Sequence, residues 1–240
     1  MVDKIDINIA TLWRQGHVVK TINSLRNQSE FGTANIICNN WTAEQEQFIV
    51  KELGDDKRIK MYKGNNAKES NEKLRYVGVG TNKYCGFFDD DIIYSEDYLA
   101  YLIAGVEKYQ AYVSLHGVVF NDVVNSYYRD RTVYRGLKTV ENDVCVDVAS
   151  NCGSVFRRDF FDNYQKWYTF AGNVGMDDLY CAYFCMQKRI PRMVLKHNEN
   201  YIKHKEQFPE DNYVFNKYAL TGNDKVQTDF VNNFIKKINK

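Results

Sequence analysis

The sequence predicts a single-domain α/β protein in which helices flank a central sheet. From residue 5 onward, stretches with the apolar pattern of strands alternate with stretches that have helical spacing. The chain has 240 residues, 44% of them hydrophobic, which is enough to bury one substantial core. No internal repeat or linker composition divides the chain, so we expect one domain over residues 1–240.

The first half of the chain is predicted to contain four strands, each followed by a helix. Short apolar or alternating runs predict strands over residues 5–9, 34–38, 58–62 and 84–88. Apolar residues at helical spacing predict connecting helices over residues 18–25, 43–53, 73–80 and 95–109. Thr42 and Ser95 are the predicted N-caps of the second and fourth helices.

The second half is less regular. Apolar runs predict strands over residues 111–115, 117–120, 144–149 and 192–195, and the polar segment 121–142 is expected to leave the sheet. Residues 155–161 are predicted to open a helix, and another is expected over residues 179–188, directly after Asp177 and Asp178. Residues 229–240 form a basic amphipathic tail, which we expect to pack against the domain, although such a tail can also touch a membrane.

Composition argues against several classes of protein. The chain has 32 Lys and Arg against 31 Asp and Glu, whereas a nucleic-acid binder normally shows a strong basic excess. The amino terminus lacks the basic and apolar regions of a signal peptide, and no stretch approaches the length of a membrane span. We therefore expect a cytoplasmic protein with no transmembrane segment and no nucleic-acid partner, whose six cysteines are free thiols.

Three consecutive aspartates, Asp89, Asp90 and Asp91, follow the fourth predicted strand. In open α/β sheets, ligands bind outside the carboxyl ends of the strands. Carboxylate oxygens are the ligands that hard divalent cations prefer, so a metal site is favoured over a solvated acidic turn, which stays open as the simpler alternative. A calcium-binding EF-hand loop does not fit, because Ile93 and Tyr94 stand where that loop needs an oxygen ligand and a glycine.

Five segments occur in an order and spacing that is typical of one enzyme family. They are INIATLWR (7–14), IICNNWT (36–42), the Asn- and Gly-bearing residues 65–78, YCGFFDDD (84–91) followed by SEDYL (95–99), and GMDDL (175–179). Together they resemble the nucleotide-sugar-dependent glycosyltransferases of the GT-A fold, particularly the inverting enzymes of the family-2 type, over about residues 6–195. The resemblance implies a Rossmann-like, twisted mixed sheet flanked by helices. The chain departs from the family pattern at the end of the first strand, where Pro, Tyr and Asn are replaced, and at Asn39, which stands in place of a base-reading Asp.

The resemblance also implies roles for individual residues. Mn²⁺ or Mg²⁺ would be bound by Asp91 first and Asp89 next, with His204 or His197 as an extra ligand, whereas Asp90 would contact the ribose. The other residues expected to bind the nucleotide sugar are Thr11, Trp13, Arg14, Asn39 and Lys73.

Asp178 is the expected catalytic base and Asp177 the alternative, because inverting transfer needs a carboxylate that takes the acceptor proton. Without the metal motif, the simpler interpretation of this acidic pair is that it caps and charges the start of a helix.

The predicted function is metal-dependent, inverting transfer of a sugar from a nucleoside-diphosphate sugar to a glycan or glycoconjugate acceptor. Residues 1–100 would form the nucleotide-sugar-binding half, residues 101–205 the acceptor-binding and catalytic half, and residues 206–240 a helical tail. Aromatic and polar residues within 127–135 and 167–173 are expected to line the acceptor. Two other classes stay open: a sugar nucleotidyltransferase, although residues 11–16 match its Gly-rich phosphate loop poorly, and a non-catalytic module that binds nucleotide sugars or glycans.

Overall fold

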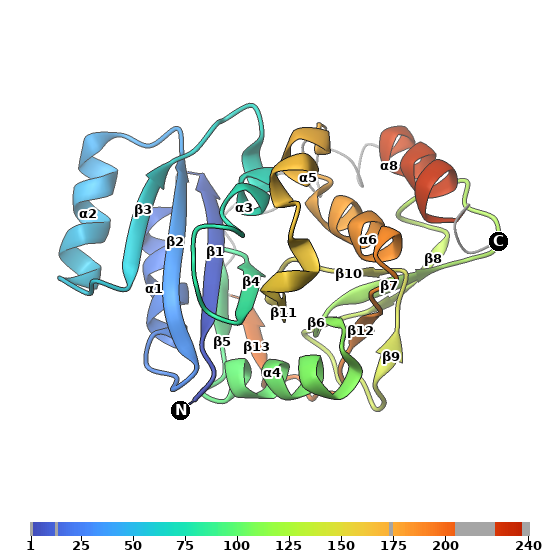
Figure 1. Ribbon diagram of the computed structural model, residues 1–240, viewed down its shortest axis with the longest axis horizontal. Coiled ribbons are helices and arrows are strands. Elements are labelled where there is room, and N and C mark those ends of the chain that lie inside the picture. Colours follow the sequence, from blue (N-terminus) through green and yellow to red (C-terminus); the bar gives the residue numbers. More distant parts are fainter. Residues whose placement is uncertain (1, 13, 173–174, 205–223, 237–240) are drawn as a thin grey trace.

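An eight-stranded mixed sheet forms the centre of the molecule (Figure 1). The computed structural model describes residues 2–12, 14–172, 175–204 and 224–236. The strand order is β3-β2-β1-β4-β11-β6-β12-β9. The first four strands in this order run parallel, whereas β11 runs antiparallel to both of its neighbours. The predicted α/β class, with a mixed sheet and flanking helices, is confirmed.

The alternation of strands and helices in the first half follows the prediction, with small shifts at the ends of the elements. The strands are β1 (Ile5–Leu12), β2 (Phe31–Asn39), β3 (Ile59–Lys63), β4 (Tyr84–Phe88) and β5 (Ile92–Tyr94). The helices are α1 (Gln15–Leu25), α2 (Ala43–Leu53), the 3₁₀ turn η1 (Glu69–Asn71), α3 (Glu72–Arg75) and α4 (Tyr98–Tyr109). Thr42 caps α2 as predicted, because its hydroxyl accepts from the backbone N–H of Gln45 and its own N–H donates to the Gln45 side chain.

Two details of this half differ from the prediction. The helix expected over residues 73–80 ends at Arg75, because Gly78 and Gly80 disfavour helix. A side chain at Gly78 would lie 2.1 Å from the ring of Tyr164, so this glycine also allows a close approach. Ser95 is not the N-cap of α4, which begins after Asp97 without a side-chain cap.

The second half completes the central sheet and adds two small ones. β6 (Tyr112–Ser114), β9 (Val144–Cys145), β11 (Ser154–Arg157) and β12 (Arg192–Val194) belong to the central sheet. β7 (Gly117–Phe120), β8 (Arg131–Tyr134) and β10 (Val148–Ala149) form a three-stranded antiparallel sheet, and β13 (Ile202–His204) pairs with β5. The helices are the 3₁₀ turn η2 (Arg158–Phe161), α5 (Tyr164–Phe170), α6 (Asp177–Gln187), α8 (Lys225–Phe230) and the π-helical turn η5 (Val231–Ile235).

Two predictions for this half are wrong in detail. Residues 155–161 do not open a helix, since β11 lies there and only a 3₁₀ turn follows it. The strand expected over residues 144–149 is split into β9 and β10, which belong to different sheets. The segment 121–142 leaves the central sheet as expected, and its strand β8 belongs to the small antiparallel sheet. Short apolar runs do not distinguish a buried strand from a helix, and the sheet neighbours of β11 decided the outcome.

The central sheet is buried on both faces, and each face has its own core. In β4, Cys85 and Phe87 face one core, whereas Tyr84 and Phe88 face the other, as expected for side chains that alternate along a strand. One core includes buried residues of α3, α6 and η5, and the other includes residues of α1, α2 and α4. Figure 1 shows α3, α5 and α6 in front of the sheet and α1 behind it. The carboxyl end of β4 therefore emerges between two packed layers.

The described part of the C-terminal tail packs against the domain, as the sequence predicts. Phe230, Val231 and Ile235 are buried in the core that also contains α6. Residues 237–240 lie outside the described residues. No helix in the described part of the chain is both long and apolar enough to cross a membrane.

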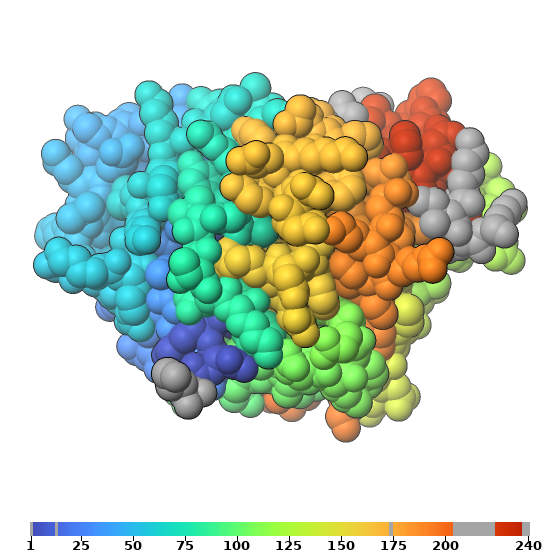
Figure 2. Space-filling model, viewed as in Figure 1, coloured from blue at the N-terminus to red at the C-terminus, as the bar shows by residue number. Residues whose placement is uncertain are grey.

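Segments that are far apart in the sequence pack side by side on the face shown in Figure 2, where the teal segment with α3 meets the gold segment with α5. A pocket of about 410 Å³ lies where these segments meet, and Gly78, Asn82, Arg158 and Tyr164 are among its lining residues. It lies near the amino ends of β1 and β4, and none of its lining residues belongs to the predicted site.

A buried ion pair ties β1 to the residue that follows β11. The carboxylate of Asp6 is 1% exposed and lies 2.5 Å from the guanidinium of Arg158. Asp6 also accepts hydrogen bonds from the side chains of Thr33 (2.7 Å) and Asn82 (2.6 Å). Removing one partner of a buried pair leaves an uncompensated charge, which costs far more than losing an exposed pair.

We expect Arg158→Met to lower the free energy of unfolding by about 3–5 kcal/mol, because it leaves Asp6 buried without its cation. The matched control is Arg157→Met, which removes an exposed pair with Asp159 and should cost less than about 1 kcal/mol. Urea unfolding of both variants measures the difference. Equal losses in the two variants would contradict this view of the Asp6–Arg158 pair.

Candidate active site

The three aspartates form the turn between β4 and β5, at the carboxyl end of a buried strand. Thr21 of α1 fixes this turn, because its hydroxyl lies 3.0 Å from the carbonyl oxygen of Asp90 and 2.8 Å from that of Ile92. The strand order places the turn beside the end of β1, which lies between β2 and β4. The predicted ends of the first, second and fourth strands therefore share one edge of the sheet.

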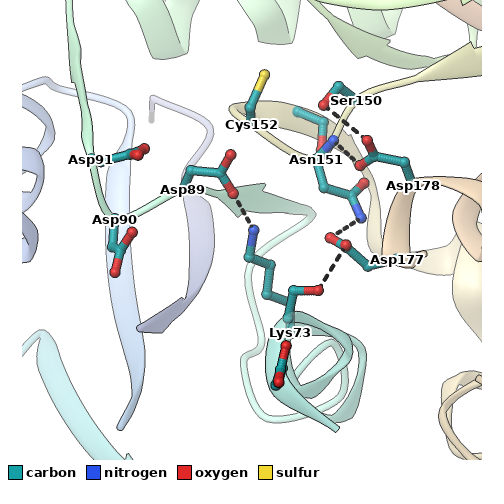
Figure 3. Close-up of polar contacts among 12 residues, drawn as sticks. Lys73, Asp89, Asp90, Asp91, Ser150, Asn151, Cys152, Asp177 and Asp178 are labelled. Atoms are coloured by element: carbon teal, nitrogen blue, oxygen red, sulfur yellow. Dashed lines mark hydrogen bonds and ion pairs between the residues drawn. The ribbon is translucent and has the colours of Figure 1, made fainter. Parts of the chain in front are cut away.

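Two cations contact the aspartates. The guanidinium of Arg14 lies 3.1 Å from the carboxylate of Asp90 and 3.2 Å from that of Asp91. The ammonium group of Lys73 lies 2.5 Å from the carboxylate of Asp89. Figure 3 shows the Asp89 carboxylate pointing toward Lys73, whereas the Asp90 carboxylate points in a different direction. The repulsion expected among three adjacent carboxylates is thus offset by two cations from distant parts of the chain.

Lys73 is the buried centre of this charge cluster, with a side chain that is only 3% exposed. Burial alone would lower the pKa of its ammonium group, but Asp89, Asp177 and Asp178 raise that pKa above its usual value. The ammonium group of Lys73 therefore stays protonated. Figure 3 shows it between Asp89 on one side and Asp177 and Asp178 on the other.

The acidic pair Asp177 and Asp178 occupies the first turn of α6, but its carboxylates bond to other parts of the chain. Asp177 accepts from the hydroxyl of Ser70 and the side-chain amide of Asn151, both at 2.9 Å. Asp178 accepts from the backbone N–H of Asn151 at 2.7 Å and from the hydroxyl of Ser150 at 3.2 Å. The start of α6 has no side-chain cap, so the capping interpretation of the pair does not describe these contacts.

The two carboxylates differ in their surroundings. Asp177 is buried, whereas Asp178 as a whole residue is half-buried. Removal from bulk water, the adjacent Asp177 and the more distant Asp89 raise the pKa of Asp178 toward neutrality, against the opposing effects of the Asn151 N–H and Lys73. Such a carboxylate can accept a proton near neutral pH, as a general base requires.

The aspartates fit a divalent cation in chemistry but do not by themselves complete a site. No group of three or more His, Cys, Asp or Glu side chains in the described ranges is arranged to hold a metal ion. Mg²⁺ usually takes one or two carboxylates and completes its shell with water and phosphate oxygens. Asp89 is the most exposed of the three carboxylates, at 41%, and Asp91 is 18% exposed. The aspartates could therefore supply the protein ligands of such an ion and leave its other coordination positions open.

The residues expected to bind the nucleotide lie at the same edge of the sheet. Thr11 and Asn39, near the ends of β1 and β2, are both 2% exposed. The Asn39 side-chain amide donates to the carbonyl oxygen of Glu69 at 3.3 Å. The Thr11 hydroxyl and the Asn39 side-chain oxygen are buried and have no hydrogen-bond partner among the described residues. Trp13 lies outside the described residues.

The two histidines proposed as extra metal ligands, His204 and His197, lie in different surroundings. The backbone of His204, in β13, pairs with Ile92, the residue after Asp91, so the chain brings it to the acidic turn. Its side chain lies outside the described part of the structure. His197 is buried, and its two ring nitrogens bond to the carbonyl oxygens of Leu195 and Arg135, so it is a structural residue and not a metal ligand.

Several residues that bond to the site were not predicted from the sequence. Ser70, Ser150 and Asn151 bind the acidic pair, and Thr21 supports the acidic turn. They are ordinary polar residues in loops or on a helix, and their local sequence carries no signal for these roles. Only the proximity of distant segments identifies them.

Comparisons with known proteins bear on the fold and the family. The model of "Glycosyl transferase family 2" matches residues 7–165. Among solved structures, "Mannosyltransferase PcManGT from Pyrobaculum calidifontis in complex with GDP-Man and Mn2+" is similar, with a TM-score of 0.55 and 10% sequence identity. The match covers 83% of this chain and 56% of that chain, so this chain spans little more than half of that protein. At this identity the likeness shows the fold alone. A comparison with curated protein sequences finds no significant match.

Proposed function

The chain belongs to glycosyl transferase family 2, and on this premise we propose that it transfers a sugar, with inversion, from a nucleoside-diphosphate sugar to a hydroxyl of a glycan or glycoconjugate. The observation that carries the proposal is the arrangement around Lys73. This one buried ammonium group lies between Asp89 of the acidic turn and the carboxylates of Asp177 and Asp178. A candidate metal site and a candidate base thus lie on two sides of one cation.

Donor binding is assigned to the sheet edge that carries Thr11, Arg14, Asn39 and the acidic turn. Asp91 and Asp89 would hold Mn²⁺ or Mg²⁺, and the bound ion would neutralise charge on the departing diphosphate. The chain's own cations, Arg14 and Lys73, lie within 3.2 Å of these carboxylates and would contact diphosphate oxygens. The mannosyltransferase with a similar fold was solved with GDP-Man and Mn²⁺, which supports a nucleotide-sugar donor and a divalent ion.

The transfer step is assigned to Asp178. In an inverting reaction, the acceptor hydroxyl attacks the anomeric carbon from the face opposite the diphosphate, and a carboxylate takes its proton. Hydrogen bonds from Ser150 and the Asn151 N–H orient the Asp178 carboxylate, and its raised pKa makes it an effective base near neutral pH. Asp177, held by Ser70 and Asn151, stays as the alternative base.

Some finer assignments stay predictions. They are the division of the chain at residues 100 and 205, the acceptor wall over residues 127–135 and 167–173, the glycan nature of the acceptor, a ligand role for His204, and the cytoplasmic location. Residue 173, in the second acceptor segment, lies outside the described residues. Residues 205–223, which connect β13 to α8, also lie outside them.

The proposal predicts that nucleoside diphosphates stabilise the protein more strongly when a divalent ion is present. A ligand at about 100 times its Kd adds roughly 2.7 kcal/mol, which for a chain of this size corresponds to a rise in Tm of several degrees. A thermal-shift panel of nucleoside diphosphates and nucleotide sugars, with Mn²⁺ or with EDTA, measures this shift.

Product analysis separates the three classes of function. Slow release of nucleoside diphosphate from one of the nucleotide sugars is expected of a transferase that uses water as a poor acceptor. Release of pyrophosphate would instead indicate a nucleotidyltransferase, and metal-dependent binding without turnover a non-catalytic module. The absence of any metal-dependent shift across the panel would contradict the proposal.

A further inference from the structure

Asn151 contacts both carboxylates of the acidic pair, through two different groups. Its side-chain amide donates to Asp177 at 2.9 Å, and its backbone N–H donates to Asp178 at 2.7 Å. The residue is only 1% exposed. The side-chain oxygen is also occupied, because it accepts a short hydrogen bond from the hydroxyl of Tyr112.

The orientation of the Asn151 amide follows from the chemistry of its neighbours. The Asn151 NH₂ group donates to a carboxylate oxygen of Asp177, so this end of the amide faces Asp177. The opposite end must then accept, and the Tyr112 hydroxyl is the donor. That hydroxyl lies 2.5 Å from the hydroxyl of Ser154, which can donate to it in turn. A buried chain of hydrogen bonds therefore runs from β11 through β6 to Asp177.

The backbone of the loop that carries Asn151 is held in place independently. The N–H of Ser150 donates to the carbonyl oxygen of His116, and the N–H of Gly153 donates to that of Phe87, both within 3.0 Å. Gly153 has a φ of +123°, a conformation that side-chain-bearing residues rarely adopt, and this lets the chain turn sharply into β11. The loop thus presents the Asn151 N–H to Asp178 from a fixed position.

We propose that Asn151 is a positioning residue that separates the roles of the two carboxylates. Its side chain, oriented by Tyr112, holds the Asp177 carboxylate in one orientation, and its backbone N–H orients Asp178 as the carboxylate that takes up a proton. The inference rests on the proposed function, because it assigns the two members of the acidic pair to different parts of the transfer reaction.

The charged groups around the pair are consistent with this separation. Asp178 is influenced by Asp177 on its own helix, by Asp89 after β4 and by Lys73 on α3. The neighbouring Cys152, Cys181, Tyr112 and Tyr127 stay neutral, because burial raises the pKa of each. Asp177 is the member of the pair that receives two side-chain donors, from Ser70 and Asn151. Asn151, itself held by Tyr112, supplies one of these two donors.

The test removes the amide and follows both carboxylates directly. In protein labelled with ¹³C at the aspartate carboxyl carbons, NMR at one fixed pH gives the chemical shift of each carboxyl carbon, with Asp177→Asn and Asp178→Asn used for assignment. We expect Asn151→Leu to move the Asp177 resonance, because the hydrogen bond from the Asn151 amide is lost. Tyr112→Phe, which keeps the ring, should move the same resonance by less and serves if Asn151→Leu does not fold.

The matched control is Asn35→Leu, which removes an equally buried asparagine that bonds to Asn8. It should leave both carboxyl resonances in place. If Asn151→Leu also leaves the Asp177 resonance in place, the inference is wrong, whether or not the protein turns over a nucleotide sugar. With an active donor, kcat of Asn151→Leu should fall about tenfold or more and its pH profile should move, while the donor KM stays within about twofold. Failure of the wild-type protein to use any donor would count against the proposed function, and the NMR result would still decide the inference.

Discussion

Asp178→Asn is expected to lower kcat by about 10²–10⁴, because the proposed reaction loses the group that takes the acceptor proton. Asparagine has nearly the same shape as aspartate and can still bond to Ser150, so the loop and helix α6 should keep their structure. Donor binding should persist, since the proposed donor contacts lie at the ends of β1, β2 and β4. Steady-state kinetics together with a nucleoside-diphosphate thermal shift separate the two properties.

The pH dependence provides a second measurement for the same variant. A general base must be ionised to accept a proton, so the wild-type rate should fall as the pH decreases through the pKa of Asp178. Burial, Asp177 and Asp89 raise that pKa toward neutrality, so the fall should occur well above the usual range of a carboxyl group. The remaining activity of Asp178→Asn should lack this decline.

Two control variants make the assignment falsifiable. Asp162→Asn changes an exposed carboxylate that pairs with Lys188 and should leave kcat unchanged. Asp177→Asn tests the alternative base. Normal turnover by Asp178→Asn, or its loss in Asp177→Asn alone, would contradict the assignment of Asp178.

Asp91→Asn is expected to weaken the metal-dependent binding of nucleoside diphosphates by at least about tenfold, and Asp89→Asn should do so too. An amide oxygen carries no net charge and is a poorer ligand for a hard divalent cation than a carboxylate. Isothermal titration with Mn²⁺ and a nucleoside diphosphate, repeated with EDTA, isolates the contribution of the metal. We expect each variant to retain only the weaker, metal-independent binding that Arg14 and Lys73 support.

Asp90→Asn is the matched comparison for these variants, because it changes the middle carboxylate, which bonds to Arg14 and has a side chain that is only 8% exposed. It should reduce affinity for ribose-containing ligands with and without the metal. Asp55→Asn, at an exposed carboxylate paired with Lys57, should have no effect. If both Asp89→Asn and Asp91→Asn bind nucleoside diphosphates in the presence of metal as strongly as the wild-type protein does, there is no basis for a metal site at this turn.

The sequence predicted more of the first half of the fold than of the second. The strands around residues 5–9, 34–38 and 84–88 have clear patterns because parallel, doubly buried strands need apolar side chains on both faces. The pattern around Val155 and Phe156 was ambiguous, and the prediction of a helix there was wrong. Only the pairing of β11 with β4 and β6 made it a strand.

The candidate site was also predicted only in part from the sequence. The positions of Asp89, Asp90 and Asp91 at a strand end, and of Asp177 and Asp178 at the start of a helix, were predicted from local pattern and from resemblance. The partners of these acids were not predicted as partners. Arg14 reaches Asp90 across 76 residues, Ser70 reaches Asp177 across 107, and local sequence contains no information about such distances.

By itself, then, the sequence determined the order of the strands along the chain, the placement of acidic residues at their ends and the family to which the chain is similar. These features depend on side-chain periodicity and on short motifs, which neighbouring residues fix. Only the tertiary structure decided that Lys73 lies between the two acidic groups and that Asn151 contacts both members of the second group. These contacts depend on the order and register of strands in the sheet, which result from packing the whole chain into two cores.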